Sequence, residues 1–287
     1  MKKNRIGLHL ASWSIVLNLF LFVIKYVVGL ISGSIAIIID AWHTLSDSFT
    51  SLIVILGFKI SAKPPDDKHP FGHGRIEMIA TVIVGTILAI VGFEFLNKAI
   101  NNISDKSIAS YNLFTIIVII FSVVSKEVMA QICLYQGKKN KSKLLHADGW
   151  HHRTDALTSS IILIGIFFSK RFWWIDGALG IVLALVILYS AYSILKKSVS
   201  ILIGEEASEG LQKEIQNSIK KYCDLEIEYH HFHIHRYGDH KEVTFHITLD
   251  PEIKLKDAHK ISTKIENILF ENLALETTIH IDPKSDD

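Results

Sequence analysis

The sequence has little cysteine and almost no net charge. Its two cysteines, Cys133 and Cys223, stand far apart without a paired spacing, which argues against a disulfide framework and against a thiolate metal site. Free thiols are typical of a protein whose soluble part faces a reducing cytosol. The formal charge of +1 is a poor average, because residues 1–200 carry 20 Lys and Arg against 11 Asp and Glu, while the remainder carries 10 against 18. We therefore expect the two parts to occupy different environments.

Long apolar stretches are abundant. Six lie before residue 200, each close to the roughly 20 residues that a helix needs to cross a bilayer, which excludes a soluble globular protein. Helices are expected because each spanning segment must hydrogen-bond its own backbone. The predicted spans are residues 11–31, 34–58, 76–97, 112–135, 144–168 and 172–195. The first stretch lacks a small-residue cleavage site, so we interpret it as a transmembrane helix rather than a signal peptide.

Lysine and arginine are distributed unevenly over the predicted connections. With a cytoplasmic N-terminus, 13 of these residues lie on the cytoplasmic side and four lie outside. This bias predicts that both termini are cytoplasmic. The basic cytoplasmic loops and the short chain favour a bacterial inner membrane as the location.

The polar C-terminal part is predicted to be a separate cytoplasmic domain. We place the boundary between a six-helix transmembrane domain, residues 1–203, and a soluble domain, residues 204–287, which is just long enough to bury a small core. The hydrophobic period predicts helices at residues 208–222 and 256–270 and strands at residues 227–236, 241–249 and 277–281. This order favours a small open sheet with helices on one face.

Two similar polar motifs interrupt the second and fifth apolar stretches. Residues 40–47 have the sequence Asp-Ala-Trp-His-Thr-Leu-Ser-Asp, and residues 148–155 have the sequence Asp-Gly-Trp-His-His-Arg-Thr-Asp. The motifs lie three spans apart, so the two helices should run in opposite directions through the membrane. This favours two inverted three-helix halves with a site between them near the middle of the bilayer.

The motifs place histidine and aspartate pairs where charge is costly. A carboxylate at the bilayer centre costs about 2.5 to 3.5 kcal/mol, so a partner is required. His43 with Asp47, and His151 with Asp155, are spaced i,i+4 and share a helix face. Two such pairs supply four nitrogen and oxygen donors, a set that suits tetrahedral Zn²⁺. The alternative is a proton relay or a hydrogen-bonded His–Asp pair that holds the helices together. The presence of the same motif in two spans favours the metal site.

Other polar residues near these motifs and in the following loop are further candidates. Asp40 and Asp148, three residues before each first histidine, are predicted to be helix-end acids or groups that support the ligands. The loop after the second span contains Asp66, His69 and His73, spaced so that a short loop could close on one metal ion. The alternative is a polar loop with two solvated histidines.

Histidine is concentrated in the C-terminal domain, which holds eight of the 15. Alternation along a strand places every second residue on one face. Several imidazoles and a carboxylate could therefore converge at the sheet edge in a two-metal site. The candidates are His231, His233, His235, His246, His259, His280 and Asp282. For His230, His233, His235 and His240 individually, we favour a hydrophilic sheet face.

These separated motifs resemble the cation diffusion facilitator family of divalent-metal/proton antiporters. The resemblance lies in His-Pro-Phe-Gly-His-Gly from His69, His-His-Arg-Thr-Asp-Ala-Leu from His151, Ala258-His259, and Ile-His-Ile-Asp-Pro from Ile279. It implies a transport site, a loop site, and a ferredoxin-like α+β tail domain that dimerises and holds two metals. The implied ligands are His43, Asp47, His151 and Asp155 in the membrane, Asp66, His69 and His73 in the loop, and His231, His246, His259, His280 and Asp282 in the tail.

The predicted function is export of divalent cations, most specifically Zn²⁺/H⁺ antiport by alternating access, and not an enzymatic reaction. The resemblance implies that a histidine at the position of His43, rather than a second carboxylate, is usually associated with zinc. Manganese transporters of the family tend to have aspartate at the position of His151, so this histidine argues against manganese. The alternatives are export of Fe²⁺, Mn²⁺, Co²⁺ or Cd²⁺, and, from another class, a membrane di-iron oxygenase with histidine boxes. The expected partners are metal ions, protons, the lipid bilayer and a second copy of the chain, without nucleic acid. A charge clasp between Arg75 and Glu205 is predicted to join the loop to the tail.

Overall fold

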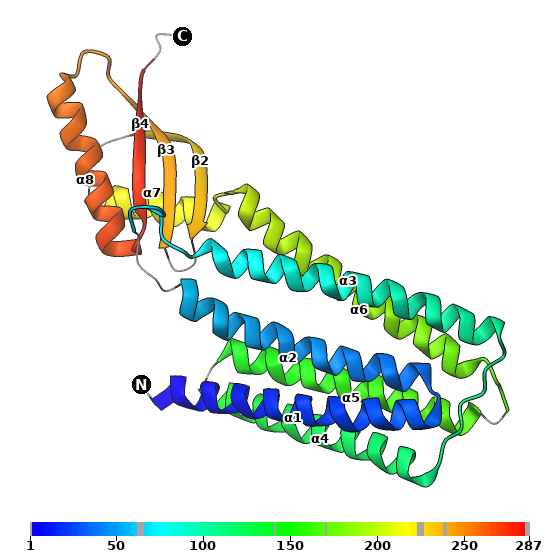
Figure 1. Ribbon diagram of the computed structural model, residues 1–287. Helices are drawn as coiled ribbons and strands as arrows, with labels where there is room; N and C mark the ends of the chain where they lie inside the picture. Colours follow the sequence, from blue (N-terminus) through cyan, green and yellow to red (C-terminus); the bar gives the residue numbers. More distant parts are fainter. Residues whose placement is uncertain are drawn as a thin grey trace. The chain divides into compact units, whose positions relative to one another are not determined.

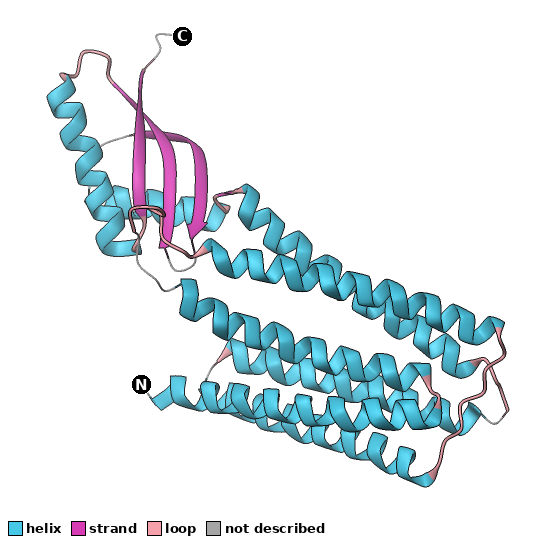
Figure 2. Ribbon diagram, in the orientation of Figure 1, coloured by secondary structure: helices cyan, strands magenta, loops and turns pink. Residues whose placement is uncertain are grey.

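The computed structural model describes residues 2–61, 66–140, 142–169, 171–222, 227–237 and 240–284 (Figure 1). The chain forms two compact units, one comprising Met1–Ile53 with Ile83–Leu195, and the other Val54–Val82 with Lys196–Asp287. Six long helices come first along the chain, followed by two shorter helices and a small sheet (Figure 2). The long helices are α1 Lys2–Ser32, α2 Ile35–Ser61, α3 Arg75–Ser104, α4 Leu113–Asn140, α5 Lys143–Ser169 and α6 Ile175–Ile203.

The first unit is a bundle in which glycines allow helices to approach closely. A Cβ atom on Gly149 of α5 would lie 2.7 Å from the Leu134 side chain of α4, and one on Gly137 of α4 would lie 2.8 Å from the His146 backbone. These two contacts bring the polar segment of α5 against α4. Apolar side chains fill the remaining core, with Ile37, Ile119, Ile162 and Ile187 among the buried residues.

The end of the bundle where α2 begins is fixed by one buried carboxylate. Asp176, at the start of α6, accepts hydrogen bonds from Ser34 Oγ at 2.5 Å, from the Ile35 amide at 2.8 Å and from Tyr111 Oη at 2.8 Å. An acceptor at a helix N-terminus satisfies free amide donors and complements the helix dipole. Asp176 therefore fixes where α2 starts, and with it the position of the motif at residues 40–47.

Four of the long helices are apolar enough to cross a membrane. Within the described residues these are Ser12–Ser32 of α1, and α3, α4 and α6 in full. Their large apolar side chains are widely exposed, including Ile90 and Phe93, as a lipid-facing surface requires. α5 carries the polar motif, and the described side chains of α2 end at Phe49. The membrane character of the helical part is confirmed, and six spans remain a prediction.

The second unit contains a four-stranded sheet in the order β1-β2-β3-β4. β2 pairs with β3 in antiparallel fashion, and β4 joins β3 in parallel after α8. Helices and strands follow one another as the sequence predicted, with bounds that differ by at most three residues and an unpredicted two-residue strand added. The elements are β1 Glu205–Glu206, α7 Glu209–Tyr222, β2 Glu228–Tyr237, β3 His240–Leu249, α8 Leu255–Leu273 and β4 Glu276–Pro283.

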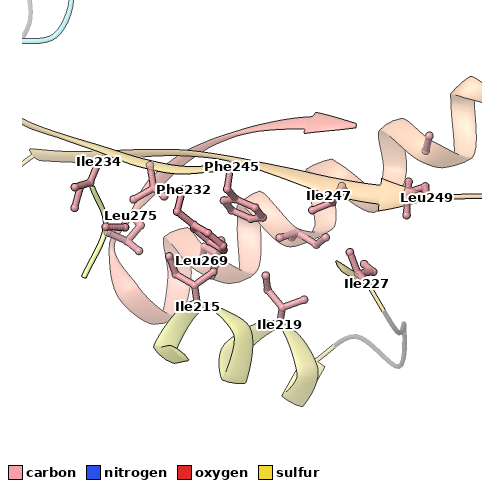
Figure 3. Packing of buried hydrophobic residues seen from close by; sticks show 14 residues of the cluster. Ile215, Ile219, Ile227, Phe232, Ile234, Phe245, Ile247, Leu249, Leu269 and Leu275 are labelled. Carbon is pink, nitrogen blue, oxygen red and sulfur yellow. The ribbon is translucent and has the colours of Figure 1, made fainter. Parts of the chain in front are cut away.

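One face of this sheet forms the core of the soluble part. Ile215 and Ile219 of α7 and Leu269 of α8 pack against Phe232 and Phe245 of the strands, as Figure 3 shows. The alternation of buried and exposed residues along β3 follows the period of two expected for a half-buried strand. The opposite face is therefore left to the polar residues of the strands, among them the histidines.

Candidate metal centres

The four predicted membrane ligands come together from α2 and α5. His43 Nε2 lies 3.8 Å from Asp155 Oδ1, and His151 Nε2 lies 3.5 Å from Asp47 Oδ1 and 3.8 Å from Asp155 Oδ2. One ligand atom each from His43, Asp47 and Asp155 lies within 4.8 Å of the others. Each histidine thus faces a carboxylate of the other helix. The i,i+4 spacing lets each of the two helices supply two ligands.

The donor chemistry of this cluster fits a divalent cation of the zinc type. Two imidazoles and two carboxylates offer nitrogen and oxygen donors, and four such ligands match the usual coordination number of Zn²⁺. Asp155 is buried with only 7% of its side chain exposed. A buried carboxylate requires compensating positive charge, which a bound cation supplies.

Lys126 of α4 is a functional candidate that the sequence interpretation missed. Its side chain is fully buried, and Nζ donates a hydrogen bond to Asp155 Oδ2 at 2.8 Å. The ammonium therefore compensates the same carboxylate that a metal ion would use. The signal was present in the sequence, because a lysine within an apolar span is a functional candidate by default.

Asp40 belongs to a separate buried network. Lys25 Nζ lies 2.7 Å from Asp40 Oδ2 and donates to Thr44 Oγ1 at 3.3 Å and to Ser159 Oγ at 3.1 Å. Ser159 Oγ in turn donates to Asp40 Oδ2 at 3.0 Å. A charge pair held by further hydrogen bonds is the arrangement that makes burial tolerable. The network joins α1, α2 and α5 beside the ligands, in keeping with the supporting role predicted for Asp40.

The loop candidates are also brought together. His69 Nδ1 lies 3.3 Å from Asp66 Oδ1, His73 Nε2 lies 3.5 Å from Asp66 Oδ2, and the two imidazole rings are 4.6 Å apart. The turn forms because Asp66 Oδ1 accepts hydrogen bonds from the His69 and Lys68 amides, and because Gly72 adopts a φ of 80°. The hydrogen bond from the His69 amide lowers the pKa of the Asp66 carboxyl below its ordinary value.

In the tail, the sheet register places three histidines in one row. His230 of β2 pairs with His246 of β3, which pairs with His280 of β4. Asp282 lies next to this row, with Oδ2 at 3.0 Å from His230 Nε2 and 2.9 Å from His246 Nδ1, and with Oδ1 at 3.3 Å from His280 Nε2. The contact with His246 is the main reason that the pKa of Asp282 lies below its usual value.

A β-bulge adds a further histidine to this cluster. The pairing of β2 with β3 shifts register between His230 and His233, and His231 has a φ of 51°. Extra residues at a bulge break strict alternation. Two overlapping groups result, His230–His231–His246 and His246–His280–Asp282, each with ligand atoms within 4.8 Å of one another. The sequence favoured a hydrophilic sheet face for His230, whereas the structure places it in one of these groups, and its role stays a prediction.

The remaining predicted residues lie elsewhere in the described chain. His259 of α8 is in none of the described three-ligand groups and lines a shallow surface with Lys260 and Glu271. The Arg75 guanidinium lies 4.3 Å from the centre of the Tyr237 ring, and Glu205 Oε1 accepts a hydrogen bond from Ser200. The roles of His259 and of the Arg75–Glu205 clasp stay predictions.

Histidine–aspartate pairs that meet between two long helices, with Asp155 buried, together with a histidine-rich sheet domain, define a membrane protein that handles metal cations. The pattern named cation efflux transmembrane domain matches residues 12–203, and the pattern named cation efflux protein, cytoplasmic domain, matches residues 207–284. The chain therefore belongs to the cation diffusion facilitator family of metal efflux transporters, as the sequence motifs predicted. Members of this family are transporters and not enzymes, so the di-iron oxygenase alternative is wrong.

Several curated relatives match most of the chain. Uncharacterized transporter MJ0449 of Methanocaldococcus jannaschii is 34% identical over 276 residues, which cover 94% of this chain and 95% of the relative. Manganese efflux system protein MneP of Bacillus subtilis is 29% identical over 294 residues, covering 98% of each chain. Magnetosome protein MamB of Magnetospira sp. is 34% identical over 154 residues, covering 54% of this chain and 53% of the relative.

Proposed function

We propose that the protein exports Zn²⁺ from the cytosol in exchange for protons. The observation that carries this proposal is the convergence of His43, Asp47, His151 and Asp155 between α2 and α5. Metal ions bind deprotonated imidazole and carboxylate, so Zn²⁺ and protons compete for the same four side chains. Metal displaces protons when the site faces the cytosol, and protons displace metal when it faces the other side. The downhill flow of protons then drives export.

Alternating access is supported by the duplicated motif. Inverted halves with a site between them commonly work by rocking around a fixed site, and α2 and α5 each contribute one motif here. The full proposal is a six-span protein of the inner membrane with residues 1–203 as the transport domain. The boundary to the tail, residues 204–287, and the cytoplasmic location of both termini belong to the same proposal.

The tail and loop clusters are proposed to regulate transport. The tail is proposed to be a ferredoxin-like domain that forms a homodimer. The dimer is supported by the family pattern that matches residues 207–284, because its name describes a dimer. Zn²⁺ bound by the histidine row or by the Asp66 loop would stabilise one arrangement of the dimer. A ligand shifts a conformational equilibrium only by its preference for one state, so these sites act as sensors when their affinity differs between states.

Manganese is the second candidate cargo. Two relatives from Bacillus subtilis carry the name manganese efflux system protein, MneP and MneS, and cover 98% and 99% of this chain. Against manganese stand the two imidazoles of His43 and His151, because Mn²⁺ prefers oxygen donors. Fe²⁺, Co²⁺ and Cd²⁺ are further cargoes that the same donor set accepts.

Metal uptake into proteoliposomes tests the transport site. Wild-type protein should load Zn²⁺, and the Asp155→Asn and Asp47→Asn variants should lose at least about 90% of this uptake, because each removes a charged ligand. Glu94→Gln is the matched control, since Glu94 is an acid of α3 that lies at the surface of the protein and pairs with Lys98. Uptake by Asp155→Asn at the wild-type rate would overturn the site.

A further inference from the structure

A further cluster of ligand-type side chains lies beside the proposed transport site, between α4 and α5. Cys133, Asp148 and His152 each place one possible ligand atom within 4.8 Å of the other two. Cys133 Sγ is 3.4 Å from Asp148 Oδ2, and His152 Nε2 is 3.8 Å from the same oxygen. Cys133 is fully buried and the His152 side chain is 1% exposed. Sulfur, nitrogen and oxygen donors thus converge between α4 and α5, where the sulfur and the imidazole are buried.

The helix packing holds this cluster in place. Asp148 and His152 are spaced i,i+4, so they share one face of α5. Gly149 and Gly137 permit the close approach of α4 on which the contact with Cys133 depends. His152 Nδ1 is buried without a hydrogen-bond partner in the described chain, whereas Nε2 lies 2.9 Å from Ser14 Oγ of α1. Nε2 is the nitrogen that lies 3.8 Å from Asp148 Oδ2, so a metal ion in this cluster would take the place of its contact with Ser14.

The internal repeat gives the cluster a direct counterpart. Cys133, Asp148 and His152 each stand 108 residues after Lys25, Asp40 and Thr44, the same offset that relates the two histidine–aspartate motifs. In the first half, the Lys25 ammonium lies against the Asp40 carboxylate. In the second half a thiol replaces that ammonium and an imidazole replaces the threonine hydroxyl. The second half therefore has a carboxylate without this fixed cation, and metal ligands in place of the other two groups.

We propose that Cys133, Asp148 and His152 bind a soft or borderline divalent cation, such as Zn²⁺ or Cd²⁺, at a waiting position before the transport site. Thiolate and imidazole ligands select such ions over Mg²⁺ and Ca²⁺. Binding replaces the S–H bond of Cys133 with a sulfur–metal bond and releases one proton to solvent. The sequence argument against a thiolate metal site considered the two cysteines alone and overlooked a mixed ligand set.

The position of the cluster along α5 is the reason that we place it before the transport site. This order rests on the proposed direction of transport. Asp148 lies seven residues before Asp155 on α5, about 10 Å along a helix, on the side proposed to face the cytosol. Its side chain is 35% exposed, so an arriving ion meets it first. His152 connects the two places, because its Nδ1 lies 4.0 Å from Asp155 Oδ2. Three protein ligands leave one coordination position open, which favours exchange over permanent binding.

The thiolate supplies a spectroscopic test that is independent of transport. Full-length protein carrying Cys223→Ser keeps Cys133 as its single thiol and should develop the ultraviolet charge-transfer band of a thiolate–Cd²⁺ bond when titrated with Cd²⁺. Adding Cys133→Ser or Cys133→Ala should abolish the band in protein that still elutes as a single species in detergent. Asp148→Asn should weaken Cd²⁺ binding measured by this band by about tenfold or more. Absence of the band with Cys133 intact, or its persistence without Cys133, overturns the proposal.

Two comparisons separate this site from the transport site. Asp47→Asn in the Cys223→Ser background should retain the band, because it removes a transport ligand and leaves the thiolate cluster whole; loss of the band there contradicts a separate site. In proteoliposomes, Cys133→Ala should raise the half-saturating Zn²⁺ concentration severalfold, because the arriving ion loses its thiolate ligand. If wild-type protein moves no Zn²⁺ but shows the band, the proposed function fails and this site stands. If wild-type protein takes up Zn²⁺ but shows no band, the proposed function stands and this site fails.

Discussion

At the scale of single residues, the balance of charge around Asp155 decides how the transport site behaves. Asp155 has three imidazoles and the ammonium of Lys126 within 4.0 Å, the imidazoles being those of His43, His151 and His152. A fixed positive charge close to a divalent cation is repulsive, by about 4 kcal/mol per unit-charge pair at 4 Å with an effective dielectric constant of 20. Lys126 therefore compensates one of the two carboxylates of the metal-free site, and we expect it to weaken metal binding and so to favour release.

Removing that ammonium should tighten metal binding. The Lys126→Met variant should bind Zn²⁺ at least about tenfold more strongly, because the cation no longer meets a positive charge. The metal-free variant should also be less stable by about 3 to 5 kcal/mol, since a buried carboxylate loses its partner. Calorimetric titration and thermal unfolding with and without Zn²⁺ measure both effects. Lys126→Arg keeps the charge as a control, and unchanged or weaker Zn²⁺ binding by Lys126→Met would contradict this role.

His43 is expected to set the choice of metal. Its replacement in His43→Asp reduces the nitrogen donors from two to one and adds a negative charge, which favours ions that accept oxygen ligands and looser geometry. Transport of Cd²⁺ and Mn²⁺ should rise relative to Zn²⁺. Competition between the three metals in proteoliposomes measures this change. An unchanged order of preference, or an equal loss for all metals, would mean that His43 only packs against α5.

At the scale of elements, the buried network of α1, α2 and α5 should act as a structural link. Lys25→Met leaves the Asp40 carboxylate buried without its ammonium partner, so we expect a loss of about 3 to 5 kcal/mol in unfolding free energy. The double variant Lys25→Met with Asp40→Asn removes both charges and should recover most of that loss. Thermal unfolding in detergent measures both. A double variant as unstable as the sum of its single variants would contradict a direct pair.

The bulge in β2 shows where sequence reasoning reached its limit. Period two along a strand located β2 and β3 to within one residue, and of the alternating histidines on β2 only His231 joins a described ligand group. A bulge adds a residue that strict alternation does not include, so alternation did not predict that His230 lies in the same group. The histidine–aspartate pairs of α2 and α5 were predicted from a helical period alone, whereas Lys126 and Cys133 depend on how α4 packs against α5.

A comparison of two histidines on β2 tests the register. His230→Ala should weaken Zn²⁺ binding by the tail about tenfold or more, because His230 contacts both Asp282 and the His246 ring. His235→Ala, further along the same strand opposite Glu242, should leave binding unchanged. Zn²⁺ titration of full-length protein carrying Asp47→Asn, Asp66→Asn and Cys133→Ser separates the tail sites from the proposed transport, loop and thiolate sites. Equal effects of the two substitutions would contradict the bulged arrangement.

At the scale of the whole molecule, the two halves share a plan but differ in charge. Both carry the histidine–aspartate pair, and only the first carries the lysine that neutralises its preceding aspartate. In the first half the Asp40 carboxylate is paired with the Lys25 ammonium, whereas in the second half the Asp148 carboxylate faces the Cys133 thiol. With the proposed thiolate site, this asymmetry would give a direction to binding that two identical halves would lack. It also agrees with a transporter in which metal and protons take turns at one shared site.

Simultaneous measurement of metal entry and interior pH tests the central claim most directly. Proteoliposomes with an acidic interior, and with the cytoplasmic face outward, should take up Zn²⁺ faster than vesicles without a gradient, and their interior pH should rise as metal enters. Asp155→Asn should show neither effect. Zn²⁺ entry at the same rate with and without the gradient, with no change in interior pH, would contradict exchange of Zn²⁺ for protons.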